Sequence, residues 1–160
     1  MVLQDIKLVL YDFDDTLCIH QKRGHTDYDE QDLSHRVYRG DDNLWPNSVP
    51  NKHMGLFMKE CEELGIKQGL MSLTPMFKQS TAKQKWVEDV YGVRLENYCV
   101  GSAEEKLKQM KILARVFGIN REQILLIDDK TWTLNQVVIS GFKGWSPMQV
   151  VNYIEERGNE

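Results

Sequence analysis

The chain has 160 residues, enough for one domain with a substantial core but not for two ordinary domains. Apolar residues make up 41% and charged residues 28%, which is the balance of a globular protein and excludes a disordered one. A formal net charge of -4 argues against a surface built to bind bulk nucleic acid.

The three cysteines, Cys18, Cys61 and Cys99, are far apart and include no C-x-x-C pair. This usage suits neither a disulfide framework nor a zinc site, and it predicts a reducing, cytoplasmic environment. No stretch approaches the roughly 20 apolar residues of a membrane helix, and the N-terminus lacks the pattern of an export signal. We therefore expect no membrane partner, and a monomer or a small homo-oligomer.

Apolar runs and helical periodicities alternate along the chain. In order, they predict a strand at 6–11, a helix at 51–64, a strand at 66–72, a helix at 78–91, a strand at 98–100, a helix at 103–117, a strand at 123–127, a helix at 131–139, a strand at 142–145 and a helix at 147–155. Strands that alternate with helices predict an α/β fold, in which a mainly parallel sheet carries helices on both faces. We expect residues 1–160 to form one domain.

The segment from Cys18 to Pro50 interrupts this alternation, because it shows little periodicity and contains several turn formers. Loops of this length in compact domains are usually functional or disordered. It is predicted to be an inserted loop or a minimal lid over the active site. Arg36, Arg39 and Trp45 are its candidate substrate contacts, although a solvated loop with anchoring aromatics is the alternative that we favour slightly.

Four carboxylates follow two of the predicted buried strands. Asp12 and Asp14 come after the strand at 6–11, and Asp128 and Asp129 after the strand at 123–127. Ligands of open parallel sheets bind beyond the carboxyl ends of the strands, and oxygen ligands of this kind suit Mg²⁺. Two acids spaced i and i+2 can serve as nucleophile and proton donor. The alternative, that one such pair merely caps a turn, is weakened by the presence of two pairs.

The run Asp12-Phe13-Asp14-Asp15-Thr16 resembles the Asp-x-Asp-x-Thr signature of haloacid dehalogenase phosphatases. Ser72, with Thr74 as the alternative, is similar to the family's second motif, and Lys106 resembles the third, with Lys108 and Lys111 as competitors. The acids at 128 and 129 are similar to the fourth. The resemblance implies a Rossmann-like three-layer sandwich. Too few residues separate the second and third motifs for a large cap domain, as in the compact magnesium-dependent phosphatases.

The resemblance also implies the roles of these residues. Asp12 would attack phosphorus and carry an aspartyl-phosphate, and Asp14 would act as acid and then as base. Ser72 and Lys106 would bind phosphate. Magnesium would be bound by Asp12, by the backbone carbonyl of Asp14 and by Asp128, with Asp129 as a direct or water-mediated ligand. Thr16 would support the loop, and Asp15 is interpreted as a turn residue.

These features favour a Mg²⁺-dependent phosphatase that hydrolyses a phosphomonoester of a small molecule or of a phosphoprotein. Two alternatives are a non-catalytic domain that binds a phosphorylated partner and a phosphotransferase that acts on a carrier-bound substrate. His20, His25, His35 and His53 form no metal-like spacing, and no role is predicted for them.

Overall fold

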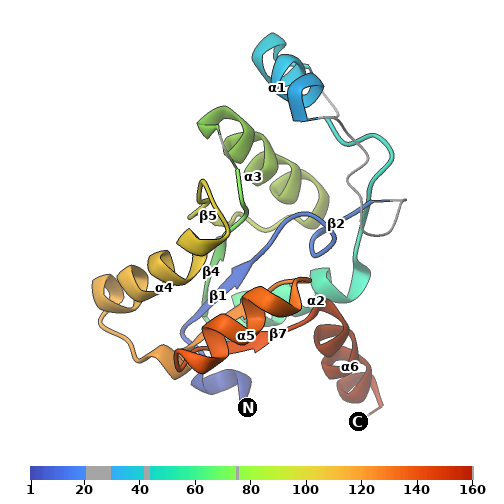
Figure 1. Cartoon of the computed structure of the whole chain (residues 1–160). Coiled ribbons are helices and arrows are strands. Elements are labelled where there is room, and N and C mark those ends of the chain that lie inside the picture. The colour runs from blue at the N-terminus through green and yellow to red at the C-terminus, as the bar shows by residue number, and fades with distance from the viewer. Residues whose placement is uncertain (21–29, 42–43, 75, 160) are drawn as a thin grey trace.

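A five-stranded parallel sheet forms the centre of the computed structural model, which describes residues 1–20, 30–41, 44–74 and 76–159 (Figure 1). Its strand order is β5-β4-β1-β6-β7. The bounds are β1 Leu8–Tyr11, β4 Lys67–Leu70, β5 Glu96–Asn97, β6 Ile124–Ile127 and β7 Lys143–Trp145. The order places β1 and β6, the two strands that precede the acidic pairs, side by side at the middle of the sheet.

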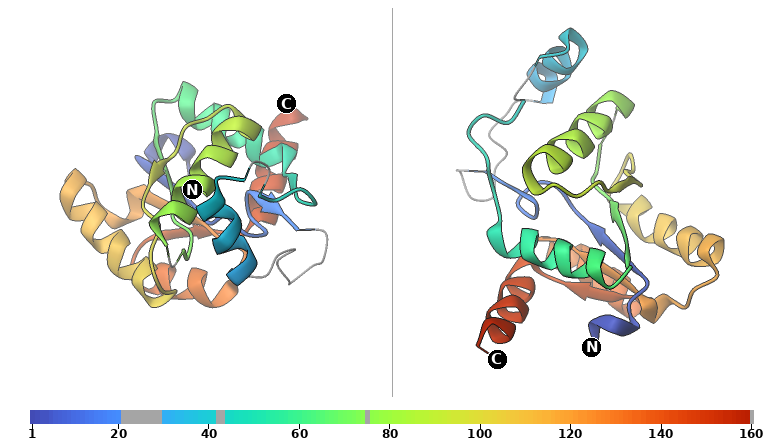
Figure 2. Two further views of the ribbon diagram at one scale, coloured as in Figure 1. Left: turned by 90° about the horizontal axis from the view of Figure 1, so that it is seen from above. Right: turned by 180° about the vertical axis from the view of Figure 1, so that it is seen from behind.

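Helices cover both faces of the sheet and form three layers with it (Figures 1 and 2). Their bounds are α1 Glu30–Arg39, α2 Lys52–Glu63, α3 Phe77–Tyr91, α4 Glu104–Phe117, α5 Thr131–Ile139 and α6 Pro147–Gly158, with short 3-10 turns η1 Leu3–Asp5 and η2 Arg121–Gln123. Val9 and Tyr11 of β1 join a core cluster with residues of α2, α3 and α6, whereas Leu8 and Leu10 join one with α4 and α5. The predicted α/β sandwich is confirmed, and the described residues include no large cap.

The strand register brings distant segments to one edge. Tyr11 is paired with Ile127 on one side and with Leu70 on the other. Asp12 and Asp128 are therefore the first residues beyond two adjacent strands, and the backbone N–H of Asp12 donates to the carbonyl of Ile127 at 2.9 Å. Parallel pairing thus explains why acids 116 positions apart in the sequence meet.

The helix boundaries follow local chemistry that the sequence contains. Asn51 precedes α2, and its side chain accepts hydrogen bonds from the backbone N–H groups of His53 and Met54. Ser146 and Gln149 form a capping box at the start of α6, with Pro147 in the first turn. Gly92 ends α3 with φ 71°, a left-handed conformation that glycine adopts at little cost.

Helix α1 corrects the prediction of an irregular segment from Cys18 to Pro50. Among the side chains of this helix that the structure describes, Leu33 alone is fully buried, and Val37 is partly buried against the core, so the sequence shows no broad apolar stripe. An ion pair of 3.1 Å between Asp32 and Arg36, four residues apart, supports the helix. α1 packs on α3, a contact between distant segments that periodicity within the segment does not reveal.

The edge strand β5 lies at Glu96–Asn97, so the predicted strand at 98–100 was placed too late. Tyr98 and Val100, the residues that motivated that prediction, lie just after the strand and make other contacts. The ring of Tyr98 lies against Gly69 of β4, so close that a Cβ at Gly69 would meet it at 2.5 Å. Val100 forms one isolated bridge with Leu73. Leu95, just before the strand, is fully buried and anchors this edge.

Strands β2 (Cys18–Ile19) and β3 (Val49–Pro50) pair antiparallel beside the main sheet. The pair brings the two ends of the inserted segment together, and residues 21–29 and 42–43 between them lie outside the described part of the chain. Among the helices of the described chain, none has the length and apolarity that crossing a membrane requires.

Candidate active site

The turn after β1 holds the first acidic motif in a fixed shape. The carbonyl of Phe13 accepts hydrogen bonds from the backbone N–H groups of Thr16, Leu17 and Cys18. Asp15 has φ 59°, a left-handed conformation that suits an Asp in a turn, and its side chain accepts from the backbone N–H of His20 at 3.2 Å. Asp15 thus occupies a turn position, and Thr16 is fully buried beneath the loop.

Lys106 lies between the acids that follow β1 and β6. Its Nζ donates to Oδ1 of Asp12 at 3.0 Å and to Oδ2 of Asp128 at 2.8 Å, and all three side chains are buried. Burial lowers the pKa of Lys106, but Asp12 and Asp128 more than offset this effect, so the pKa is raised and the side chain is cationic. The competing Lys108 and Lys111 are exposed on the outer side of α4.

Asp12, Asp128 and Asp129 form a cluster in which one carboxylate oxygen of each lies within 4.8 Å of the others. Burial raises the pKa of Asp12, and the Lys106 cation opposes this rise. Burial in the site and then the charge of Asp12 raise the pKa of Asp129 to about 8, although part of its side chain reaches solvent. Protons or a cation must therefore neutralise the cluster, and three hard oxygen donors fit a divalent ion such as Mg²⁺.

The side chain of Asp14 points to a different set of partners from that of Asp12. Its Oδ1 lies 2.8 Å from Nε2 of His20, and its Oδ2 lies 3.5 Å from Nζ of Lys83. The other ring nitrogen of His20, Nδ1, lies 2.9 Å from the hydroxyl of Ser48. In the described residues, the Asp14 side chain is therefore not part of the three-carboxylate cluster. The predicted contribution of its backbone carbonyl to the metal site remains a prediction.

Both predicted hydroxyls lie near one lysine. Nζ of Lys83 donates to Oγ of Ser72 at 3.0 Å and to Oγ1 of Thr74 at 3.4 Å, and both hydroxyl residues are buried. Ser72 follows β4, the neighbour of β1, so the sheet brings it to the same edge as Asp12 and Asp14. The structure thus gathers Ser72 and Thr74 at one point and leaves the choice between them open.

Sequence reasoning missed Lys83 and His20, although both are buried and contact a predicted site residue. A signal for Lys83 was present, because it stands four residues before the buried Val87 and shares the inner face of α3 with it. No comparable periodic signal marks His20, which lies next to the short strand β2.

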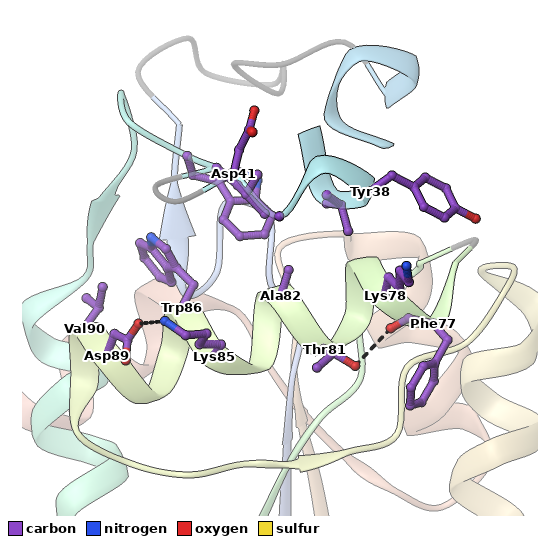
Figure 3. A pocket seen from close by; sticks show the side chains of 14 residues that line it. Tyr38, Asp41, Phe77, Lys78, Thr81, Ala82, Lys85, Trp86, Asp89 and Val90 are labelled. Atoms are coloured by element: carbon purple, nitrogen blue, oxygen red, sulfur yellow. Dashed lines mark hydrogen bonds and ion pairs between the residues drawn. The ribbon is translucent and has the colours of Figure 1, made fainter. Parts of the chain in front are cut away.

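Of the candidate substrate contacts, Arg36 and Arg39 lie in α1 and Trp45 lies in the segment that follows it. A pocket of about 900 Å³ lies beside the contact between α1 and α3, and Tyr38, Asp41, Lys78 and Trp86 are among the side chains around it (Figure 3). Trp45 also lines this pocket, is 3% exposed, and packs on Phe13 with ring centroids 5.0 Å apart.

The two arginines of this segment engage local partners in the structure. Arg36 donates to the carbonyl of Leu44 at 3.1 Å and pairs with Asp32, and Arg39 pairs with Asp41 at 2.8 Å. Neither pairs with a carboxylate of the three-acid cluster in these contacts. Substrate binding by Arg36, Arg39 and Trp45 therefore remains a prediction.

Comparison of the whole fold with solved structures gives consistent neighbours. A hypothetical protein of Xanthomonas campestris superposes with a TM-score of 0.57 at 18% identity, over 90% of this chain and 65% of the other. The cobalt-bound deoxy-D-mannose-octulosonate 8-phosphate phosphatase of Haemophilus influenzae gives 0.55 at 19% identity, over 90% and 70%. A HAD family enzyme of Bacteroides thetaiotaomicron, in complex with magnesium and inorganic phosphate, gives 0.56 at 15% identity, over 88% and 93%.

These identities are low, so the likeness establishes the fold and not the chemistry. No protein-family model and no curated protein sequence matches the chain. The chain spans just under two thirds of the Xanthomonas protein.

Proposed function

Because the chain has the haloacid dehalogenase fold, we propose that it is a Mg²⁺-dependent phosphatase that hydrolyses a phosphomonoester through an aspartyl-phosphate on Asp12. The observation that carries the proposal is the buried Lys106, which lies 3.0 Å from Asp12 and 2.8 Å from Asp128 at the carboxyl ends of adjacent strands. Buried clusters of acids that are paired with a cation are enriched at functional sites.

In the first step, a carboxylate oxygen of Asp12 attacks phosphorus and forms a P–O bond, while the bond from phosphorus to the ester oxygen breaks. Asp14 donates its proton to the departing oxygen, so the alcohol leaves neutral. Lys106 holds the Asp12 carboxylate in place and offsets the repulsion between two anions. The hydroxyl of Ser72, which lies at the same edge of the sheet as Asp12, is available to a phosphoryl oxygen.

In the second step, water attacks the phosphorus of the aspartyl-phosphate. The Asp14 carboxylate takes a proton from this water, inorganic phosphate leaves, and the carboxylate of Asp12 is regenerated. Mg²⁺ bound by Asp12, Asp128 and Asp129, with the backbone carbonyl of Asp14, would supply positive charge that neutralises the phosphoryl oxygens. The nucleophile, the proton donor and the positioning cation are side chains of the protein: Asp12, Asp14 and Lys106.

The test is phosphate release from a panel of phosphorylated small molecules and phosphopeptides, with Mg²⁺ or with EDTA. The panel includes deoxy-D-mannose-octulosonate 8-phosphate, because a structural neighbour is named for its hydrolysis. We expect Mg²⁺-dependent turnover. Asp12→Asn should reduce turnover by about 10³-fold or more, because a group that acts as the nucleophile has no substitute. Asp14→Asn should reduce it by about 10²- to 10⁴-fold, the usual contribution of a general acid and base.

The matched control is Asp5→Asn, which changes an exposed acid in η1 and should leave turnover unchanged. Equal turnover by the Asp12→Asn variant and the wild type would contradict the proposal. Binding of a phosphorylated compound without turnover would instead support a non-catalytic domain, and transfer of the phosphoryl group to an added acceptor would support a phosphotransferase.

A further inference from the structure

Two buried side chains hold the predicted proton donor from both sides. His20 is 2% exposed and lies 2.8 Å from Oδ1 of Asp14, and Lys83 is 1% exposed and lies 3.5 Å from Oδ2. His20 is in turn anchored by Ser48, at 2.9 Å from its Nδ1. The two oxygens of the Asp14 carboxylate thus have partners from different parts of the chain: His20 follows β2, and Lys83 lies in α3.

Lys83 also contacts the predicted phosphate-binding hydroxyl. Its Nζ lies 3.0 Å from Oγ of Ser72, 3.3 Å from the carbonyl of Leu73 and 3.4 Å from Oγ1 of Thr74. An ammonium group only donates hydrogen bonds, so the Ser72 oxygen must accept the bond from Lys83. The Ser72 hydroxyl itself donates to the carbonyl of Leu73 at 3.5 Å, a long and weak bond that a phosphoryl oxygen can replace.

The two buried lysines divide the site between them. Lys106 contacts Asp12 and Asp128, the acids on the side of the nucleophile. Lys83 contacts Asp14 and Ser72, the side on which the leaving oxygen and the phosphoryl oxygens would be handled. Burying an ammonium is costly unless it is well paired, and the cation–π contact with Phe13, whose ring centroid lies 5.2 Å from Nζ of Lys83, offsets only part of this cost. Packing alone therefore does not account for a lysine at this position.

We propose that Lys83 and His20 are positioning residues for Asp14: they hold its carboxylate on the leaving-group side, and Lys83 also orients the Ser72 hydroxyl. This inference rests on the proposed phosphatase function. It predicts that variants of Lys83 and His20 lose more kcat/KM on substrates whose leaving group must be protonated than on substrates whose leaving group departs as an anion. An alkoxide leaves poorly unless it is protonated, whereas 4-nitrophenolate leaves readily without a proton.

The experiment compares kcat/KM for an alkyl phosphate and for 4-nitrophenyl phosphate, because kcat/KM reports on the steps up to formation of the aspartyl-phosphate. Lys83→Met removes the charge and keeps the length of the side chain, and Lys83→Arg keeps the charge. His20→Leu removes the contact, and His20→Gln keeps an N–H near the position of Nε2. Lys108→Met is the control, because Lys108 is an exposed lysine on the outer side of α4 and does not line the pocket between α1 and α3.

We expect Lys83→Met to lower kcat/KM by about 10²-fold for the alkyl phosphate, the lower range for general acid catalysis, and by about tenfold or less for 4-nitrophenyl phosphate. His20→Leu should also lower kcat/KM more for the alkyl phosphate than for 4-nitrophenyl phosphate. Its effect on 4-nitrophenyl phosphate should be smaller than that of Lys83→Met, because the contacts described for His20 do not include Ser72. Lys83→Arg and His20→Gln should each retain more kcat/KM for the alkyl phosphate, relative to 4-nitrophenyl phosphate, than Lys83→Met and His20→Leu do. Lys108→Met should match the wild type.

Circular dichroism and the stabilisation of each variant by Mg²⁺ against thermal unfolding verify that the site has folded. Equal losses on both substrates in folded variants of Lys83 and His20, or no loss on either, would overturn the inference while the wild-type turnover upheld the phosphatase function. Absence of wild-type turnover on any substrate would instead overturn the proposed function. If Lys83→Met fails to fold, the two His20 variants decide the matter through the same ratio.

Discussion

The cation at the centre of the site can be removed with little change in shape. Lys106→Met keeps the length of the side chain and deletes the ammonium that bridges Asp12 and Asp128. Without metal, the substitution leaves two buried carboxylates next to each other with no cation between them. We expect the metal-free protein to lose stability as a result.

The size of the loss follows from burial and geometry. Lys106 is 4% exposed, Asp12 is 6% and Asp128 is 0%, so solvent screens these ion pairs weakly. Removal of one partner from a buried ion pair typically costs about 3–5 kcal/mol. Asp12, whose pKa burial already raises, can take up a proton in the variant and limit the cost. We therefore predict a decrease of about 3 kcal/mol in the free energy of unfolding near neutral pH.

The assay is urea denaturation, followed by far-ultraviolet circular dichroism, in EDTA and in excess MgCl₂. Bound Mg²⁺ neutralises the same carboxylates, so the difference between variant and wild type should shrink when Mg²⁺ is added. Lys108→Met is the matched control, because it removes an exposed lysine from the same helix and should change stability by less than about 0.5 kcal/mol. Equal unfolding free energies for Lys106→Met and Lys108→Met in EDTA would refute the reasoning.

Two further predictions concern a titrating acid and a buried hydroxyl. Because the pKa of Asp129 is raised to about 8, Mg²⁺ affinity measured by calorimetry should increase as the pH rises towards and through 8. The same shift makes the metal-free protein less stable as the pH rises from about 4 to about 8, because the unfolded acid is then ionised while the folded one still holds its proton, and the effect levels off above pH 8. Asp129→Asn should weaken both trends, and a flat Mg²⁺ affinity in the wild type would contradict them. Tyr91→Phe removes a hydroxyl that donates to the carbonyl of Leu17 and accepts from the N–H of Asn51, and chemical denaturation should show a loss of about 1–3 kcal/mol. Tyr38→Phe, at a ring 61% exposed, should show no measurable loss, and equal losses for the two variants would count against the role of Tyr91.

The centre of the site could be predicted because it depends on strand ends. An apolar run that stops at an acid marks both the strand and the residue beyond it, and parallel pairing brings such residues together. This reasoning placed Asp12 near Asp128, and the motif resemblance selected Lys106 over its exposed neighbours on the same helix. The apolar runs that end in acids, and the motif that contains Lys106, are short local patterns, so a single sequence is enough to reveal them.

The remainder of the site depends on contacts between distant segments. Lys83 lies 69 positions from Asp14, and Ser48 lies 28 positions from His20. The periodicity of α3 marks Lys83 as an inner-face residue, and His20 and Ser48 look like ordinary polar residues in their own segments. Only the packing of α3 and of the β2-β3 pair brings Lys83 and His20 to Asp14. Helix α1 escaped prediction for a related reason, because the contacts described for it are the ion pair between Asp32 and Arg36 and its packing on α3, and neither forms an apolar periodicity.

The most direct test of the central claim is the detection of a phosphorylated Asp12. The wild type and Asp14→Asn are incubated with a labelled substrate and Mg²⁺, quenched in acid, and digested for mass spectrometry. The account predicts a hydroxylamine-sensitive phosphate on the peptide that contains Asp12, which accumulates in Asp14→Asn because the second step has lost its base. Continued phosphate release by Asp12→Asn, with no phosphate on that peptide in the wild type, would contradict it.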